Sequence, residues 1–358
     1  MERYDVVIVG AGPSGCSAAE KLAQNGIGVL LLEKEKLPRN KLCAGVLPER
    51  INHLLGEIPS DIVERNFIGY RLHSPKGLVV ESKFHRPGFI VSRKKFDGWM
   101  VEKARNAGVE LIDGVKVIDV MEEENKVLVQ TGIHSFPSKF LISADGSTSS
   151  IRKRVGLDGP RKEDLAIALQ VDVSLSEDDI IARMESWFDV YYPGIIDEGY
   201  GWISAHKDHI KVGVGSTSSR FKKDPKSFFK KFLEEPEVKQ KIEGGIISSI
   251  KSHVIPLSGP LPNLATKRTL LVGDAAGFVW PLTGEGIYEA VHSGQVAAET
   301  IGKMLSDPEG GLPSLYNGLL EKQGLLRLRR SVNDRDILKD AKSKEEYIQS
   351  LRKKTKRE

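Results

Sequence analysis

Three glycines near the start of the chain, Gly10, Gly12 and Gly15, have the G-x-G-x-x-G spacing with which a backbone approaches the pyrophosphate of a dinucleotide. The first permits a tight turn, the second lets backbone amides reach the phosphates, and the third lets the next helix pack on the preceding strand. Glu33 follows about twenty residues later, where a carboxylate accepts a hydrogen bond from a ribose hydroxyl. These residue types at this spacing predict a dinucleotide site.

The segments around these residues have the pattern of a strand–helix–strand unit. Residues 4–9 are apolar and β-branched, as in a buried strand, and residues 13–25 are helical in character, with Gly26 where a helix would end. A second apolar run, residues 29–32, leads to Glu33. The positive field of the helix N-terminus would face the pyrophosphate. This context favours a nucleotide-binding unit over a glycine-rich turn without a ligand.

Two later segments bear on which dinucleotide is bound. In ISADGSTSSIR a predicted strand ends at Asp145, ahead of a helix that carries Arg152. In LLVGDAAGFVWPLTGEGI the carboxylate of Asp274 could bind the ribityl hydroxyls of FAD, and the small residues after it let the backbone come close. The turn at residues 284–286 would offer helix N-terminal amides to the flavin, where negative charge develops on reduction. In this order the three motifs resemble those of the para-hydroxybenzoate hydroxylase group of flavoproteins.

Within that group the chain resembles the geranylgeranyl reductase family over roughly residues 2–322. The segment KLCAGVLP, residues 41–48, is similar to the family's Lys-x-Cys-Gly-Gly loop, with Ala44 in place of one glycine. An Arg-x-x-x-Asp segment is matched by Arg93, which the resemblance places beside the flavin, and by Asp97 at a helix start.

The aromatic Tyr-x-Trp-x-Phe-Pro segment of the same family lines its substrate cavity, and Tyr200 and Trp202 match it. Residues 203–205, Ile-Ser-Ala, depart from the Phe-Pro of that pattern, so the shape of the cavity is expected to differ. The chain is also shorter than the archaeal lipid-modifying members, mainly after the GDAAG helix.

The motifs and the resemblance together imply FAD as the cofactor. Glu33 and the three glycines would hold the adenosine end, while Arg93 and Asp274 would hold the central and flavin portions. The residues expected to bind FAD are Gly10, Gly12, Pro13, Ser14, Gly15, Glu33, Lys34, Lys41, Cys43, Ala44, Gly45, Arg93, Asp145, Gly146, Gly273, Asp274, Ala275, Gly277, Pro281, Gly284, Glu285, Gly286 and Ile287.

A cysteine in such a loop has a chemical rationale. An isolated alkene has no carbonyl to polarise it, so hydride delivery from flavin N5 must be coupled to proton delivery on the neighbouring carbon. Cys43 is the candidate acid, with Lys41 able to influence its acidity, and the alternative is that Cys43 packs as a small hydrophobe. Cys16 is expected to pack inside the first helix, whereas His206 and His209 flank a predicted hairpin turn and are expected to be solvated.

Composition sets further limits. With 358 residues, 40% of them hydrophobic, and a net charge of +4, the chain is expected to form two globular domains and gives no reason to expect a nucleic-acid partner. No apolar run approaches the ~20 residues of a membrane span, and the chain begins directly with a strand, which predicts a cytoplasmic protein. Two cysteines argue against a disulfide framework and a cysteine-held metal site, so no metal is expected.

We predict an α/β fold in which a Rossmann-like FAD-binding domain carries an inserted antiparallel β-sheet domain for the substrate. The FAD-binding domain is predicted to comprise residues 1–65, 97–160 and 265–326, and the sheet domain residues 66–96 and 161–264. Residues 327–358 are predicted to form a basic helical tail. This tail is either simply solvated or attracted to anionic lipid headgroups at the inner membrane face.

The predicted function is reduction of isolated C=C bonds in a geranylgeranyl or polyprenyl chain, as a lipid or a diphosphate, with Tyr200 and Trp202 shaping the cavity. No second nucleotide unit is evident, so NADPH, ferredoxin or a deazaflavin would dock transiently as electron donor, or a donor protein would supply the electrons. One alternative is a flavin-dependent monooxygenase or halogenase of the same fold. Another is a non-catalytic FAD protein that docks to a membrane or partner.

Overall fold

The structure, a computed structural model, describes residues 4–307 and 310–355. These residues form two compact units, each assembled from separate stretches of chain. The first unit consists of Met1–Asn40, Lys94–Arg161 and Pro256–Val332, and the second of Lys41–Arg93, Lys162–Ile255 and Asn333–Glu358.

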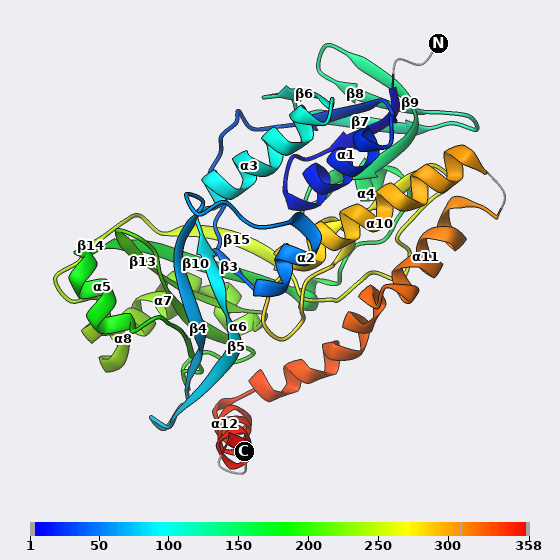
Figure 1. Ribbon diagram of the computed structural model, residues 1–358. Coiled ribbons are helices and arrows are strands. Elements are labelled where there is room, and N and C mark those ends of the chain that lie inside the picture. The colour runs from blue at the N-terminus through cyan, green and yellow to red at the C-terminus, as the bar shows by residue number, and fades with distance from the viewer. Residues whose placement is uncertain (1–3, 308–309, 356–358) are drawn as a thin grey trace. The chain divides into compact units, whose positions relative to one another are not determined.

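A mixed, mainly parallel sheet with helices packed against it is the framework of the first unit (Figure 1). Its elements are β1 (Tyr4–Val9), α1 (Pro13–Gln24), β2 (Val29–Glu33), α3 (Arg93–Asn106), β6 (Glu110–Asp113), β7 (Val117–Glu122), β8 (Val127–Thr131), β9 (Ser135–Ser143), α4 (Ser150–Arg154), β16 (Thr269–Leu271), α9 (Gly273–Ala276), α10 (Ile287–Ser306) and α11 (Leu312–Lys322). Within the residues described the sheet has seven strands in the order β6-β2-β1-β9-β8-β7, with β16 beside β9. β7 pairs with β8, and β8 with β9, antiparallel, while the other strand pairs of this sheet are parallel.

The centre of this sheet is buried on both faces. Val7 of β1 pairs with Leu30 of β2 and lies level with Leu141 of β9, and all three side chains are fully buried. Helices α1 and α10 approach closely, because Gly294 lies against the backbone of Ser14, where an added Cβ would come within 2.2 Å of the Ser14 carbonyl oxygen. The predicted strand–helix–strand unit around the glycine-rich turn is therefore present.

A larger, mainly antiparallel sheet dominates the second unit. Its elements are β3 (Val46–Leu47), η1 (Glu49–Ile51), α2 (Asn52–Leu55), β4 (Val63–His73), β5 (Val79–Val91), η2 (Lys162–Asp164), β10 (Leu165–Ser174), α5 (Glu177–Met184), β11 (Trp187–Tyr191), β12 (Gly199–Ala205), β13 (His209–Ser216), α6 (Ser219–Lys223), α7 (Pro225–Leu233), α8 (Pro236–Ile242), β14 (Ile246–Ile247), β15 (Lys251–Pro256) and α12 (Ala341–Thr355). In the described part of the chain nine strands follow the order β14-β10-β13-β12-β11-β4-β5-β3, with β15 beside β10.

One pair in this sheet differs from the predicted antiparallel arrangement. Strand β11 lies parallel to β4, with Asp189 beside Arg71, because the chain reaches β11 through β10 and α5 rather than through a hairpin. One face of the sheet is covered by helices of the same unit. Alternate residues such as Ile203 and Ala205 pack into a core with Phe229 of α7 and Val238 of α8.

The boundaries differ from those predicted, and residues 94–96 and 256–264 belong to the first unit instead of the sheet domain. Residues 41–65 fold with the second unit, because β3 pairs with β5 and β4 begins at Val63. The C-terminal segment is helical as predicted, in η3 (Leu325–Leu338) and α12, but Lys344 and Ile348 of α12 are fully buried in the second unit. Residues 1–3 and 308–309, and residues 356–358 at the end of the predicted tail, lie outside the described residues.

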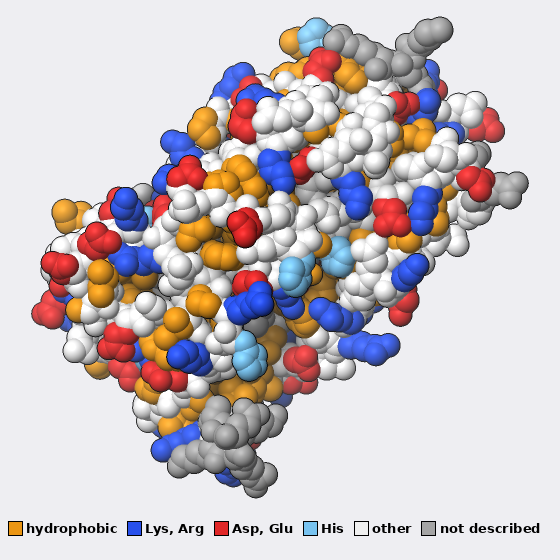
Figure 2. All heavy atoms as spheres, viewed as in Figure 1, with side chains coloured by type: hydrophobic (Ala, Val, Ile, Leu, Met, Phe, Trp, Pro, Cys, Tyr) orange, Lys and Arg blue, Asp and Glu red, His pale blue; other side chains and the backbone are white. Residues whose placement is uncertain are grey.

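Two surface properties bear on the expected partners. Among the residues described, none of the helices has both the length and the apolar character that crossing a bilayer requires. Lys and Arg side chains are interspersed with Asp and Glu over the face shown in Figure 2.

Candidate active site

The three glycines of the first motif have different structural roles. Gly10 has a φ of +107°, and a Cβ there would lie 2.2 Å from the Ala144 carbonyl oxygen. A Cβ on Gly15 would lie 1.9 Å from the Gly10 carbonyl oxygen, so both positions exclude a side chain. At Gly12 the nearest atom to an added Cβ is Nη2 of Arg39, at 3.8 Å. The turn therefore leaves space beside Gly12, on the side where α1 begins.

The N-terminus of α1 suits an anionic group in that space. Gly12 is the N-cap residue and Pro13 the first helical residue, and within the described residues no side chain caps the helix. The amides of Ser14 and Gly15 thus lie at the positive end of a helix that provides no side-chain acceptor. This arrangement fits the pyrophosphate of FAD.

Glu33 and a residue that the sequence analysis missed lie next to this turn. The buried Glu33 carboxylate accepts hydrogen bonds from the amides of Ala11, at 2.9 Å, and Glu35, at 3.1 Å. Arg39 lies between two carboxylates, with Nε 3.5 Å from Glu33 Oε2 and Nη1 3.2 Å from Asp97 Oδ2. Its guanidinium group is the cation near Gly12 that could contact a phosphate. The only sequence signal was a basic residue within the loop that follows β2, and the exposed Lys34 lies in the same loop.

The second motif, ISADGSTSSIR, holds the backbone of the third, LLVGDAAGFVWPLTGEGI, in place. Asp145 accepts hydrogen bonds from Ser143 Oγ at 2.6 Å and from the amide of Ser150 at 2.9 Å, so its carboxylate holds the start of α4. Gly146 has a φ of +85° in the same turn. The buried Arg152 donates from Nη1 to the Ala275 carbonyl oxygen at 2.7 Å. Arg152 therefore fixes the backbone beside Asp274.

The third motif lies beside the first. A Cβ on Gly273 would come within 2.6 Å of Ser14 Oγ, and one on Gly277 within 2.3 Å of the Gly259 carbonyl oxygen. Asp274 Oδ1 lies 3.7 Å from the Cβ position of Gly286, which is the N-cap residue of α10. The first unit therefore brings Asp274, the α10 N-terminus and the start of α1 together.

The remaining residues of the third motif shape the chain between α9 and α10. The Trp280 amide donates to the Glu285 carbonyl oxygen, and the Gly284 amide donates to the Trp280 carbonyl oxygen, both at 2.8 Å. Pro281 is buried within this turn, and Ile287 is the first residue of α10. The turn presents the α10 N-terminus, where the described residues provide no side-chain cap.

In the second unit, side chains from the large sheet hold the Cys43 loop. The half-buried Cys43 is a free thiol whose Sγ lies 3.4 Å from the Gly45 amide. Lys211 Nζ donates to the Cys43 carbonyl oxygen at 3.2 Å, and Ser204 Oγ donates to the Ala44 carbonyl oxygen at 3.1 Å. Lys211 thus contacts the Cys43 backbone, and an influence of Lys41 on the acidity of the thiol stays a prediction.

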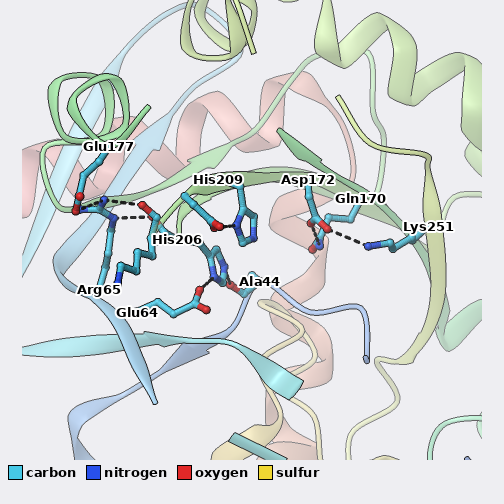
Figure 3. Close-up of polar contacts among 11 residues, drawn as sticks. Ala44, Glu64, Arg65, Gln170, Asp172, Glu177, His206, His209 and Lys251 are labelled. Carbon is cyan, nitrogen blue, oxygen red and sulfur yellow. Dashed lines mark hydrogen bonds and ion pairs between the residues drawn. The ribbon is translucent and has the colours of Figure 1, made fainter. Parts of the chain in front are cut away.

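His206 contradicts the prediction of a solvated histidine. Its side chain is fully buried, with Nδ1 2.5 Å from Glu64 Oε2 and Nε2 3.0 Å from the Ala44 carbonyl oxygen (Figure 3). The His209 ring stacks on it at a centroid distance of 4.6 Å. The turn itself was predicted correctly, and long-range packing of the loop around Ala44 buries the ring.

The same sheet face carries the predicted cavity residues. Tyr200, Trp202 and Ser204 alternate along β12, so they share one face, and Ser204 bonds to the Cys43 loop from that face. Trp202 covers Gly213, where a Cβ would lie 2.2 Å from its ring. Across residues 4–307 and 310–355, neither Trp202 Nε1 nor Gln170 Oε1 finds a hydrogen-bond partner, although both atoms are buried. An unpaired donor and acceptor on this face fit contact with a bound molecule.

Burial dominates the electrostatics of the Cys43 loop. It lowers the pKa of Lys211, against the raising effects of Cys43 and of the Asp172 and Glu64 carboxylates. It also lowers the pKa of His206; the Glu64 hydrogen bond opposes this shift, and the charges of Lys211 and His209 add to it. Arg93 is buried in the same unit.

Comparisons with known proteins agree with this geometry. Residues 3–309 match the family described as FAD binding domain. The digeranylgeranylglycerophospholipid reductase of Methanocaldococcus jannaschii is 31% identical over 84% of this chain and 78% of its own length. The chloroplastic geranylgeranyl diphosphate reductase of Arabidopsis thaliana is 32% identical over 83% of this chain, but the chain spans only 65% of that relative's length.

A solved structure shares the fold. The crystal structure of a geranylgeranyl bacteriochlorophyll reductase-like protein from Thermoplasma acidophilum has a TM-score of 0.87 and 23% identity, and the match covers 98% of this chain and 92% of that one. Together with the FAD-binding motifs and the sequence relatives, this places the chain in the geranylgeranyl reductase family of FAD-dependent oxidoreductases.

Proposed function

We propose that this protein reduces isolated C=C bonds of a geranylgeranyl or polyprenyl chain, carried by a lipid or a diphosphate. The observation that carries the proposal is the Cys43 loop, which Ser204 and Lys211 hold against the sheet face that bears Tyr200 and Trp202. A weak acid and an aromatic surface in one place suit an apolar substrate that must be protonated. The relatives whose names specify geranylgeranyl substrates support the same substrate class.

Each residue has a defined part in this proposal. When bound in its reduced form, FAD would be the source of the hydride. Cys43 Sγ donates the proton to the neighbouring carbon, so that one hydride and one proton convert each C=C bond into a CH–CH bond. Tyr200 and Trp202 pack against the prenyl chain and exclude water. In the first unit, Arg39 and the α1 amides bind the pyrophosphate, and Asp274 binds the ribityl chain.

An anaerobic experiment tests the proposal. The FAD-loaded protein is reduced with dithionite and mixed with geranylgeranyl diphosphate or a geranylgeranyl lipid, and flavin absorbance is followed with product mass. We expect flavin reoxidation and products heavier by pairs of hydrogens. A flavin that stays reduced until air is admitted would instead favour the oxygen-using monooxygenase or halogenase, or a non-catalytic FAD protein.

The role of Cys43 has a matched control in the chain's other thiol. We expect Cys43→Ser to slow reoxidation by about a hundredfold, in line with the loss of a general acid. Cys16→Ala should leave the rate unchanged, because Cys16 is only 1% exposed within α1. Equal rates for Cys43→Ser and the wild type would remove Cys43 as the proton donor.

We also propose that exposed basic residues of the C-terminal segment contact anionic lipid headgroups peripherally. Lys342 and Lys353 of α12 are exposed, whereas Lys344 and Ile348 are buried, so truncation would remove packing together with charge. Substituting Lys342 and Lys353 by glutamate keeps the packing. We expect this variant to float less with anionic liposomes than the wild type, and equal flotation would exclude a contribution from these lysines. The electron donor, whether NADPH, ferredoxin, a deazaflavin or a protein, would be found by testing which of them reduces the flavin.

A further inference from the structure

Two consecutive carbonyl groups of the Cys43 loop are held by three side chains of one hairpin. Lys211 Nζ donates to the Cys43 carbonyl oxygen, and Ser204 Oγ donates to that of Ala44. His206 Nε2 lies 3.0 Å from the same Ala44 oxygen. Ser204 belongs to the segment that departs from the family's Phe-Pro pattern, and His206 follows that segment directly. At Ser204 the departure thus places a hydroxyl group that binds the loop where the family pattern has an apolar residue.

The two contacts of the His206 ring set a condition on its hydrogens. Nδ1 lies 2.5 Å from Glu64 Oε2, and Nε2 faces a carbonyl oxygen that can only accept (Figure 3). A neutral imidazole carries hydrogen on one nitrogen only, so beside an ionised Glu64 it can make one of these bonds but not both. Both contacts are hydrogen bonds only when the His206–Glu64 pair holds one proton more than a neutral ring beside a carboxylate.

We propose that His206 positions the Cys43–Gly45 loop together with Ser204 and Lys211, and that its contact to Ala44 holds only while the His206–Glu64 pair retains this extra proton. The Cys43 thiol is then presented in one orientation at lower pH, and the loop loosens as the pair loses its proton. The link to proton delivery rests on the proposed function, whereas the positioning itself does not.

The groups around His206 determine how firmly the extra proton is held. Glu64 on β4 favours it, whereas Lys211 and His209 on β13 oppose it. Arg65, also on β4, donates to the His206 carbonyl oxygen at 2.6 Å, and Asp208 lies in the adjoining turn. Burial lowers the pKa of His206, so the ring loses its proton at a lower pH than an exposed histidine would. Ser204 does not titrate, and its contact to Ala44 persists.

Two measurements on the FAD-loaded protein test the proposal without any prenyl substrate. Nitrogen NMR of ¹⁵N-histidine-labelled protein reports which ring nitrogens of His206 carry hydrogen, with His206→Gln used for assignment. The rate of Cys43 alkylation by iodoacetamide reports how firmly the loop is held, and mass spectrometry separates Cys43 from the buried Cys16. Each variant is compared with the wild type at the same pH, so that the pH dependence of thiol ionisation affects both alkylation rates equally.

The expected results separate a pH-dependent anchor from a merely structural residue. We expect His206→Phe to be alkylated about tenfold faster than wild type at low pH and equally fast at high pH, because only the low-pH wild type has the bond to lose. Ser204→Ala is the control, and its ratio to wild type should be the same at every pH. In Glu64→Gln the amide can donate to Nδ1, so a neutral His206 keeps hydrogen on Nε2 and alkylation should stay slow across the range.

Other outcomes would overturn the proposal. One is a His206→Phe to wild-type ratio that does not change with pH, and another is a His206 ring without hydrogen on Nε2 at low pH. If His206→Phe does not fold, His206→Gln serves instead: its amide can donate to Ala44 at any pH, so alkylation should remain slow where the wild type becomes fast. Failure of prenyl reduction alongside these expected results would remove the proposed function and leave the positioning intact.

Discussion

Gly12→Ala tests whether the space beside the N-terminus of α1 receives the FAD pyrophosphate. Among the residues that the structure describes, a Cβ at this position meets only Arg39 Nη2, at 3.8 Å. The backbone, with φ −84° and ψ −179°, is ordinary for alanine. The variant should therefore fold with nearly the stability of the wild type, apart from about 1 kcal/mol for alanine at an N-cap. If the methyl group displaces one amide-to-phosphate hydrogen bond, FAD affinity should fall by at least about tenfold.

Gly15→Ala, three residues away, is the matched control. Its Cβ would lie 1.9 Å from the Gly10 carbonyl oxygen, which is 1.5 Å closer than the 3.4 Å at which ordinary contact begins. The backbone of the turn at Gly10 and that of α1 at residue 15 would have to move apart. Overpacking of this kind costs about 3 kcal/mol or more, which corresponds to a Tm lower by roughly 6–12 °C. Gly15→Ala should thus lose stability, whereas Gly12→Ala should lose cofactor.

The assay combines thermal melts of the apoprotein by circular dichroism with titration of FAD, followed by quenching of flavin fluorescence. Melting temperatures and dissociation constants are measured for both variants and the wild type. Wild-type FAD affinity in Gly12→Ala would refute the placement of the pyrophosphate. An unchanged Tm in Gly15→Ala would refute the close packing of turn and helix.

Two further predictions concern buried charges of the second unit. Burial raises the pKa of Asp189, but hydrogen bonds from His73 and Arg71 and the charge of Lys241 outweigh burial and lower this pKa to about 2. The ionised carboxylate therefore contributes about 2 kcal/mol to the free energy of unfolding above pH 4, and this contribution is lost as the pH falls toward 2. In urea melts Asp189→Asn should lose at least this amount at pH 7 and lack the acid-dependent decline, and a variant as stable as wild type would contradict the cluster's role. Burial lowers the pKa of Lys344, whose Nζ donates to the carbonyl oxygens of Pro193 and Ile196, to about 8. Between pH 8 and pH 10.5 the unfolded chain therefore binds more protons than the folded protein, so the stability of the wild type should rise by about 3 kcal/mol relative to that of Lys344→Met. Stability curves that run parallel for the two proteins would show that Lys344 is not buried.

Local patterns in the sequence were enough to predict most elements near the cofactor. The β-branched run before Gly10 and the helix that ends near Gly26 depend on residues close together in the chain, which determine backbone preference. The glycine motif could be assigned to a dinucleotide for the same reason, because turn geometry and helix N-termini are local. Its assignment to FAD came from the resemblance of the three motifs, in their order, to those of a flavoprotein group.

Residues whose role depends on distant partners could not be predicted. Arg39 became a candidate phosphate ligand because the fold places its guanidinium group near Gly12, where Asp97 of α3, 58 residues further along the chain, helps to hold it. Asp189 looked like an ordinary strand residue until β4 supplied Arg71 and His73 across a parallel pairing. Such partners are set by strand order, which periodicity does not encode.

His206 shows most clearly the difference between what local sequence determines and what distant contacts determine. The sequence predicted a hairpin turn here, which the structure contains, and a turn is normally exposed. Burial of the ring follows from Glu64 and Ala44, which lie 142 and 162 residues away in the chain. Chain neighbours decide whether a turn forms, but what covers a side chain depends on which distant segments pack against it, and so the environment of the Cys43 loop became evident only from the folded structure.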